Sequence, residues 1–234
     1  MPPKIPGKLN EPPSEAEFNA LRIAAFCRSK GGIFYRLHPT NRSTGDPWHP
    51  VFFSTRGTTR FDPENGVGTL YVAQSLAGAI LEKFDDRWGP VGSIERTLTR
   101  AELDSWWVTL IDLAPAAVFS TRGSNLSKIG TDAQLLTGDY AIARQWALRL
   151  MNHPDKIGGI AYASRHAYSR GNLAIFLRDG LRPESYDANL GPANKRWWRR
   201  EAGHGIAIVH GPQIKLAVHP QLKAILTDLE VGVL

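Results

Sequence analysis

Between residues 57 and 84, apolar and polar positions change pattern twice and predict a loop, a short strand and a helix in that order. The stretch 62–68 (DPENGVG) consists largely of turn-forming residues, and the β-type run 69–73 follows it directly. Apolar residues at helical spacing predict a helix over 75–84. Glu82 falls on a flank of this helix lined by small residues, which leaves room for a ligand to approach. The small residues are Ser75, Gly78 and Ala79.

The chain before this stretch predicts an arm, a helix and two strands. Residues 1–13 contain five prolines, which predict an extended arm. Ser14 and Glu17 have the spacing of a capping box and predict a helix that continues to about Arg28. Short strands are expected at 33–37 and at 51–54.

Downstream of residue 84, the pattern predicts further short strands. They are expected at 93–98, 107–111, 158–164 and 173–177, and as a hairpin of 206–209 with 214–218. Thr99 and Glu102 repeat the capping-box spacing and predict a short helical turn. Residues 120–138 show only a weak helical pattern.

Two longer helices are expected in the second half of the chain. Asp139 is placed to cap a helix that Pro154 ends, and a final amphipathic helix is expected over 221–229. Many short strands interspersed with a few helices predict a mixed α/β or α+β fold, most simply one α+β domain over residues 14–234.

Composition narrows the class of protein. The chain has 234 residues, of which 42% are hydrophobic and seven are Trp, enough for one sizeable core. The single cysteine, Cys27, excludes an internal disulfide and is expected on the apolar side of the first helix. No Cys/His pattern suits zinc, so no metal is expected. The N-terminal sequence and the lack of an 18-residue apolar run predict a cytoplasmic protein without a membrane span. Walker A, Rossmann, HExxH and GxSxG motifs do not occur.

The net charge of +6 and the pI of about 9.6 leave three interpretations open. A basic face could bind nucleic acid, a basic cleft could bind a phosphate-bearing small molecule, or Lys and Arg could be scattered over the surface. The one basic cluster is KRWWRR at 195–200, within a long polar segment at 180–203. No recognisable nucleic-acid-binding module accompanies it.

A set of polar and aromatic residues adjoins the predicted strands. The set comprises Arg36, Arg60, Glu82 and Ser164, with Tyr71 and Tyr162 as aromatic surface. Taken singly, each is more readily explained as structural; Arg60, for example, suits a loop salt bridge. Together they suit a dinucleotide such as NAD. Guanidinium groups bind a pyrophosphate, an aromatic ring stacks on a flat heterocycle, and a carboxylate stabilises an oxocarbenium-like transition state.

Five segments resemble the RES-domain family, the toxins of RES–Xre toxin–antitoxin modules of bacteria. They are FYRLHP (34–39), TRFDP (59–63), LYVAQSLAGAILE (70–82), GIAYASR (159–165) and NLAIF (172–176). The resemblance covers about residues 30–180. Its most specific part is the equal spacing of Arg60, Tyr71 and Glu82.

The resemblance implies a fold similar to ADP-ribosyltransferases and an activity that consumes NAD. As NAD-binding residues it implies Arg36 and Arg60 on the phosphates or the nicotinamide ribose. Tyr71 would pack on nicotinamide, with His38 and Arg165 as further contacts of the dinucleotide.

The same resemblance implies a catalytic set of Glu82, Arg60 and Ser164. Glu82 would polarise the ribose and stabilise the oxocarbenium. Ser164 would hydrogen-bond the nicotinamide side or position the acceptor.

Three functions follow for testing. The first is a toxin that breaks the nicotinamide–ribose bond of NAD with water or phosphate as acceptor and is covered by an Xre-type antitoxin. The second is a mono-ADP-ribosyltransferase acting on a cellular protein, which the additional loops at 39–50 and 180–203 would favour. The third is a basic nucleic-acid-binding module that uses Trp197 and Trp198, which the resemblance disfavours.

Overall fold

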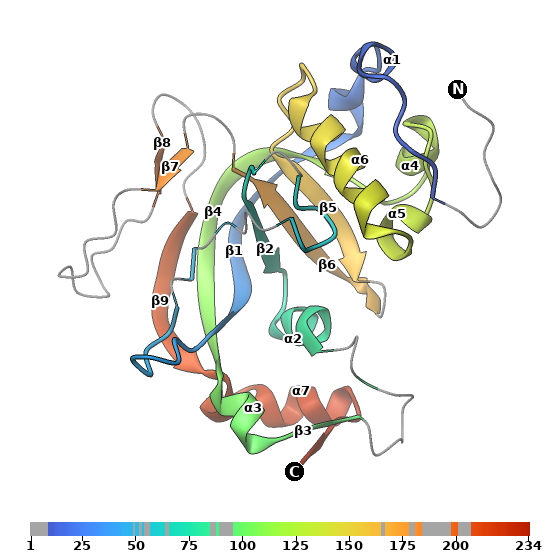
Figure 1. Ribbon diagram of the computed structural model, residues 1–234. Helices are drawn as coiled ribbons and strands as arrows, with labels where there is room; N and C mark the ends of the chain where they lie inside the picture. The colour runs from blue at the N-terminus through green and yellow to red at the C-terminus, as the bar shows by residue number, and fades with distance from the viewer. Residues whose placement is uncertain are drawn as a thin grey trace.

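The computed structural model describes residues 9–48, 50, 51, 53, 57–63, 66–84, 88, 96–164, 167–177, 181–183, 198–200 and 207–234 (Figure 1). Its principal sheet has six strands in the order β1-β2-β6-β5-β4-β9. They are β1 (Cys27–Pro39), β2 (Thr69–Ala73), β4 (Trp106–Ser120), β5 (Gly159–Ser164), β6 (Ala167–Phe176) and β9 (Ala207–Lys215). Among these strands β4 and β5 are parallel, and the other neighbouring pairs are antiparallel.

The sheet curls back on itself because β1 pairs with both β2 and β4. The β1–β4 ladder runs from the pair Cys27–Phe119 to the pair Pro39–Trp106, and Figure 1 shows both as long curved strands. The remaining described strands form two two-stranded sheets. They are β3 (Thr97–Leu98) with β10 (Gly232–Val233), and β7 (Leu181–Pro183) with β8 (Trp198–Arg200).

The described helices are mostly short. They are α1 (Glu15–Asn19), α2 (Leu76–Phe84), α3 (Arg100–Asp104), α4 (Asn125–Lys128), α5 (Gln134–Thr137), α6 (Tyr140–Asn152) and α7 (Leu222–Asp228), with 3-10 turns η1 (Ile23–Phe26) and η4 (Leu216–Val218). In Figure 1, α6 covers β5 and β6, and α2 lies between the sheet and the pair α3 and α7. Within the described ranges, no helix combines the length and apolarity needed to cross a membrane.

The apolar stripe of α2 determines which way Glu82 faces. Leu76, Ile80 and Phe84 are at most 2% exposed and pack with Leu103 of α3 and Leu226 of α7. On the same face of the sheet, α6 buries a stripe of its own against β5 and β6, and that stripe includes Ala143, Trp146, Ala147 and Leu150. Because α3 and α7 cover the apolar side of α2, the flank that carries Glu82 is left for a cavity.

Several sequence predictions are confirmed. The α+β fold class is confirmed, and the strand over 69–73 has the expected bounds. The helix expected over 75–84 is α2. The capping box of Thr99 and Glu102 is present at α3. Asp139 caps α6, accepting from the main-chain N–H of Ala141 at 2.6 Å.

The helix predicted from Ser14 to about Arg28 is wrong beyond its first turns. The capping box forms, but α1 ends at Asn19, and β1 begins at Cys27. The long ladder with β4 is the physical reason, since Cys27 already pairs with Phe119. Cys27 therefore lies half-buried in a strand, where burial and the nearby Asp155 raise the pKa of its thiol to about 11.

The hairpin predicted at 206–209 and 214–218 is also wrong. Residues 207–215 form the single strand β9 along β4. The turn-like HGP sequence lies at an irregularity between the pairs Leu110–His210 and Val108–Ile214. Gly211, with a φ of 76°, takes the left-handed conformation there, so it forms a bulge instead of a reversal.

Two smaller differences concern the segments 51–54 and 1–13. Residues 51 and 53 of the expected strand 51–54 lie outside any strand. Leu9, within the segment expected to be an arm, is 3% exposed in the core, and Trp146 Nε1 donates to the carbonyl oxygen of Asn10 at 2.8 Å. Of the basic cluster at 195–200, residues 195–197 lie outside the described residues.

Candidate active site

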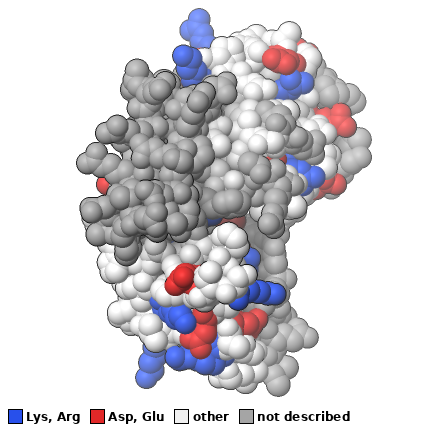
Figure 2. Space-filling model, turned by 60° about the vertical axis from the view of Figure 1, so that its left-hand side comes forward, with Lys and Arg blue, Asp and Glu red and all other residues white. Residues whose placement is uncertain are grey.

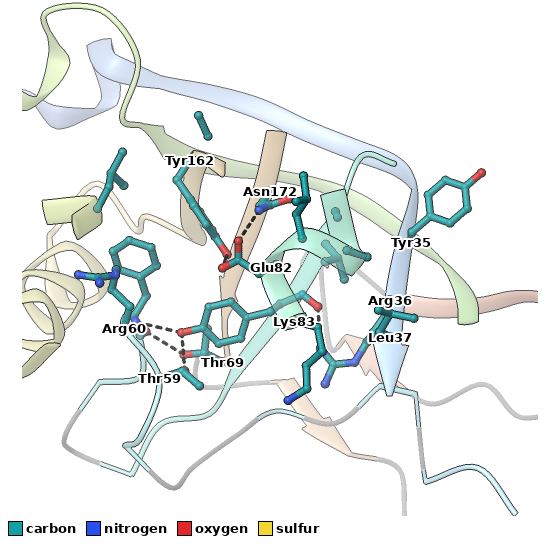
Figure 3. Close-up of a pocket in the computed structure, with 18 of the residues that line it drawn as sticks. Tyr35, Arg36, Leu37, Thr59, Arg60, Thr69, Glu82, Lys83, Tyr162 and Asn172 are labelled. Atoms are coloured by element: carbon teal, nitrogen blue, oxygen red, sulfur yellow. Dashed lines mark hydrogen bonds between the residues drawn. The ribbon is translucent and has the colours of Figure 1, made fainter. Parts of the chain in front are cut away.

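A cavity of about 570 Å³ lies where α2 meets β1, β2, β5 and β6 (Figure 3). The loop before β2 contributes Thr59 and Arg60 to its lining, and the first residue of α6, Tyr140, lines it as well. The cavity thus brings together the loop–strand–helix unit at 57–84 and strands far away in the sequence.

Glu82 points from α2 into this cavity and is held by two strands. Tyr162 Oη donates to Glu82 Oε1 at 2.9 Å, and Asn172 Nδ2 donates to Glu82 Oε2 at 2.7 Å (Figure 3). Tyr162 and Asn172 are paired directly across β5 and β6, so both side chains leave the same face of the sheet. Glu82 itself remains exposed. The carboxylate is therefore held at both oxygens and still accessible to a ligand.

The two donors to Glu82 are buried. Tyr162 is 6% exposed and Asn172 is 1% exposed. Burial, and then the Glu82 carboxylate, raise the pKa of the Tyr162 hydroxyl well above its usual value of 10. The ring of Phe61 meets the Tyr162 ring edge-on, with 5.1 Å between the centroids. Tyr162 consequently keeps its proton and acts as a fixed donor.

The Tyr71 hydroxyl anchors the loop 57–63 to β2. It accepts hydrogen bonds from Thr59 Oγ1 at 2.7 Å and from the main-chain N–H of Phe61 at 2.9 Å, and it donates to Asp62 Oδ1 at 3.1 Å. Burial, followed by the Asp62 charge, raises the pKa of Tyr71 well above 10. Since one donor and two acceptors exhaust a phenol, the ring is what Tyr71 offers to the cavity.

Arg36 presents a half-buried cation at the cavity wall. Its Nη1 donates to the carbonyl oxygen of Tyr71 at 2.6 Å, which ties β1 to β2 beside their one direct pair, Tyr35–Ala73. Burial lowers the pKa of the guanidinium to about 10. Arg36 is therefore still positively charged near neutral pH.

Arg60 is held from the other side of the cavity. Its Nη1 donates to the carbonyl oxygen of Gly138 at 2.7 Å, and its Cζ lies 4.1 Å from the centroid of the Tyr140 ring. Gly138 lies in the short connection between α5 and α6, and Tyr140 is the first residue of α6. The position of Arg60 thus depends on where α6 begins.

Lys83 adds a third cation to the lining, next to Glu82 in the sequence. Its Nζ lies 4.5 Å from the centroid of the Trp106 ring. Among the described residues that line the cavity, Glu82 is the one acid beside the three cations Arg36, Arg60 and Lys83. This balance suits a ligand with negative charge, such as one that carries phosphate groups.

Comparison with known proteins identifies the family. The model of the family described as "RES domain" matches residues 33–192 of the chain. The chain belongs to the RES-domain family. A chain of the crystal structure of the M. tuberculosis MbcT–MbcA toxin–antitoxin complex has a TM-score of 0.58, with 13% sequence identity, and the alignment covers 90% of this chain and 100% of that chain. At this identity the likeness shows the fold. No curated protein sequence matches significantly.

The RES domain brings five predicted site residues to one cavity. These are Arg36, Arg60, Tyr71, Glu82 and Tyr162. Ser164 ends β5, but its side chain lies outside the described part of the structure, and Arg165 lies outside the described residues altogether.

His38 is not brought to the cavity, in contrast to the sequence prediction. Its side chain is 1% exposed, and its Nε2 lies 2.7 Å from Thr109 Oγ1. Thr109 is the cross-strand partner of Arg36 in the β1–β4 ladder. His38 is thus part of the buried interior beside β1 and β4, and it does not line the cavity.

The sequence interpretation missed the hydrogen-bond donors to Glu82, the aromatic contact of Arg60 and the third cation of the cavity. Asn172, the hydroxyl of Tyr162, Lys83 and Tyr140 were all unassigned. The available signal was the segment NLAIF, treated only as a strand, whose first residue faces Tyr162 across the β5–β6 pair. Among the described residues, His, Cys, Asp and Glu form no group of three or more suited to a metal ion.

Proposed function

We propose that this RES-domain protein is the toxin of a toxin–antitoxin module and that it consumes NAD by cleaving the nicotinamide–ribose bond, with water or phosphate as acceptor. The observation that carries the proposal is the accessible Glu82 carboxylate, bonded at both oxygens, in a cavity that also contains Arg36, Arg60 and Lys83. Family membership supports the choice of NAD over other anionic ligands.

The residues around the cavity divide the binding of the dinucleotide among them. The cations are suited to the pyrophosphate, since guanidinium groups form charge-assisted hydrogen bonds with phosphate oxygens. The ring of Tyr71, fixed by its own hydroxyl, supplies a flat surface for the nicotinamide ring. Glu82 is then left to act at the ribose between these two groups.

Cleavage breaks the bond between ribose C1′ and the nicotinamide nitrogen. The electron pair of that bond goes to the ring nitrogen, which becomes neutral as nicotinamide leaves, and positive charge develops on the ribose. The fixed Glu82 carboxylate stabilises this charge electrostatically. An oxygen of water or phosphate then bonds to C1′, and a proton is released when the acceptor carries one.

Mass spectrometry of the products formed from NAD tests the proposal, with and without inorganic phosphate. Free nicotinamide with ADP-ribose is expected in water, and nicotinamide with phosphorylated ADP-ribose if phosphate is the acceptor. Label attached to a cellular protein would support a mono-ADP-ribosyltransferase instead. No loss of NAD under any of these conditions would refute the proposal.

A protein antitoxin is part of the same proposal. The structural neighbour named above comes from the crystal structure of a toxin–antitoxin complex. For this chain we expect an Xre-type protein to cover the cavity. Adding such a protein, encoded beside this chain, should abolish NAD loss, and unchanged NAD loss in a stable complex would contradict this part.

The face of the molecule shown in Figure 2 gives little support to a broad basic surface for nucleic acid. On the face shown in Figure 2, Lys and Arg side chains alternate with Asp and Glu among the described residues. Backbone alone is described for residues 198–200 of the basic cluster. The concentration of cations in the cavity is the feature that favours a small anionic ligand.

A further inference from the structure

We infer that Tyr162 and Asn172 are positioning residues for Glu82, and that Asn172 serves this purpose at a cost to the stability of the fold. The inference rests on the proposed cleavage of NAD and deepens the account of the same cavity. It concerns the side chains of Tyr162 on β5 and Asn172 on β6.

The orientation of the Asn172 amide follows from its neighbour. Asn172 Nδ2 lies 2.7 Å from Glu82 Oε2, and the opposite orientation would place an amide oxygen against a carboxylate oxygen, which is repulsive. With the nitrogen directed at Glu82, the amide oxygen Oδ1 is buried and has no hydrogen-bond partner among the described residues. A Cβ added to Gly78 of α2 would lie 3.4 Å from this oxygen. Gly78 has no side chain, so it leaves space for Asn172 Oδ1 but offers no side-chain donor to it.

A buried acceptor without a partner destabilises a fold, because it loses its hydrogen bonds to water on burial. Asn172 is 1% exposed, so water does not compensate from the surface. An apolar side chain of the same branching would avoid this cost. The amide is therefore best explained by what its nitrogen does for Glu82 and not by stability.

Two donors on one carboxylate restrict it more than either could alone. The terminal torsion of a glutamate is broad, so a single hydrogen bond leaves the plane of the carboxylate free to turn. Tyr162 and Asn172 bond different oxygens from paired positions on adjacent strands, which defines that plane. A carboxylate oriented before the substrate arrives needs less rearrangement when positive charge develops on the ribose.

Kinetics of Asn172→Leu and Tyr162→Phe test the inference. Each variant removes one donor to Glu82, and Tyr162→Phe keeps the ring that contacts Phe61. We expect kcat for NAD cleavage to fall about 10- to 100-fold in each, with KM little changed. For Asn172→Leu, Tm should be unchanged or higher, since the buried oxygen is gone.

Asn125→Ala is the matched control. It removes an amide hydrogen bond, from Asn125 Nδ2 to the carbonyl oxygen of Ser120 at 3.0 Å, away from the residues that line the cavity. We expect kcat to stay at the wild-type value in this variant. A fall in kcat that follows a fall in Tm in all three variants would identify a structural role and overturn the inference.

A double-mutant cycle separates this inference from the proposed function. If the wild type cleaves NAD but Asn172→Leu and Tyr162→Phe keep full kcat, the positioning role is overturned and the proposed function stands. If the wild type leaves NAD intact, the proposed function is overturned. In that case the positioning of Glu82 is tested by the Tm values of Asn172→Ala, Glu82→Ala and the double variant. A change in Tm of the double variant that differs from the sum of the two single changes supports positioning, and a change equal to that sum overturns it.

Discussion

The guanidinium of Arg60 lies over the ring of Tyr140, with 4.1 Å between its Cζ and the ring centroid. The two residues are far apart in the sequence and meet because Gly138, two residues before Tyr140, accepts a hydrogen bond from Arg60 Nη1. A cation over an aromatic face at a partly exposed site is stabilised by about 0.5–1 kcal/mol. The start of α6 thus sets the position of one cation of the cavity.

Arg60→Ala should raise the KM for NAD by roughly 10- to 100-fold, because a hydrogen bond to a charged group contributes about 1.5–3 kcal/mol. Initial rates over a range of NAD concentrations measure the change. Arg60→Lys keeps the charge but loses the planar guanidinium, so it should not restore the wild-type KM. An unchanged KM in Arg60→Ala would place Arg60 outside the binding site.

Tyr140→Leu should raise the same KM by less, about 2- to 5-fold, since it removes the aromatic face under Arg60 and leaves the bond to Gly138. Tyr140→Phe retains the face and serves as the control with the wild-type KM. If Phe and Leu raised KM equally, the hydroxyl and not the ring of Tyr140 would be the relevant group.

Local signals account for the parts of the fold that the sequence predicted correctly. Residues 69–84 were predicted because one short strand and one helix follow each other with clear periodicity, and the carboxylate of Asp139 is an unambiguous cap. The helix predicted to continue to about Arg28 was wrong because β1 begins at Cys27, which pairs with Phe119 of β4 about ninety residues later. No local pattern contains that pairing.

The same distinction applies to the cavity. Arg60, Tyr71 and Glu82 were identified because they lie on one continuous loop–strand–helix unit. Asn172 was missed because its importance arises from a cross-strand pair with Tyr162. His38 follows Arg36 by two residues in the same strand, and only the three-dimensional structure shows that it lies beyond the cavity, against Thr109.

Stability at alkaline pH should reflect the two buried tyrosines. The pKa values of Tyr71 and Tyr162 are raised well above 10, first by burial. In the unfolded chain these hydroxyls ionise at about pH 10. The unfolded state therefore binds fewer protons than the folded state above that pH, so the free energy of unfolding is intact below about pH 10 and falls as pH rises further.

Tyr162→Phe removes one of these groups, so its Tm should fall less steeply than that of the wild type between about pH 10 and 11. Arg36, whose pKa is lowered to about 10, makes the free energy of unfolding rise with pH in this range. This contribution is present in both the wild type and Tyr162→Phe. Thermal unfolding followed by circular dichroism at several pH values measures both slopes. Identical slopes would show that the Tyr162 hydroxyl is not protected from ionisation in the folded protein.

Glu82 carries the central claim, and Glu82→Gln tests it most directly. The amide has the shape of the carboxylate but lacks the negative charge that would stabilise the developing positive charge on the ribose. We therefore expect the rate of NAD cleavage, followed as nicotinamide release by mass spectrometry, to fall on the order of 100-fold or more while Tm stays near the wild-type value. Wild-type turnover in Glu82→Gln would contradict the proposed mechanism.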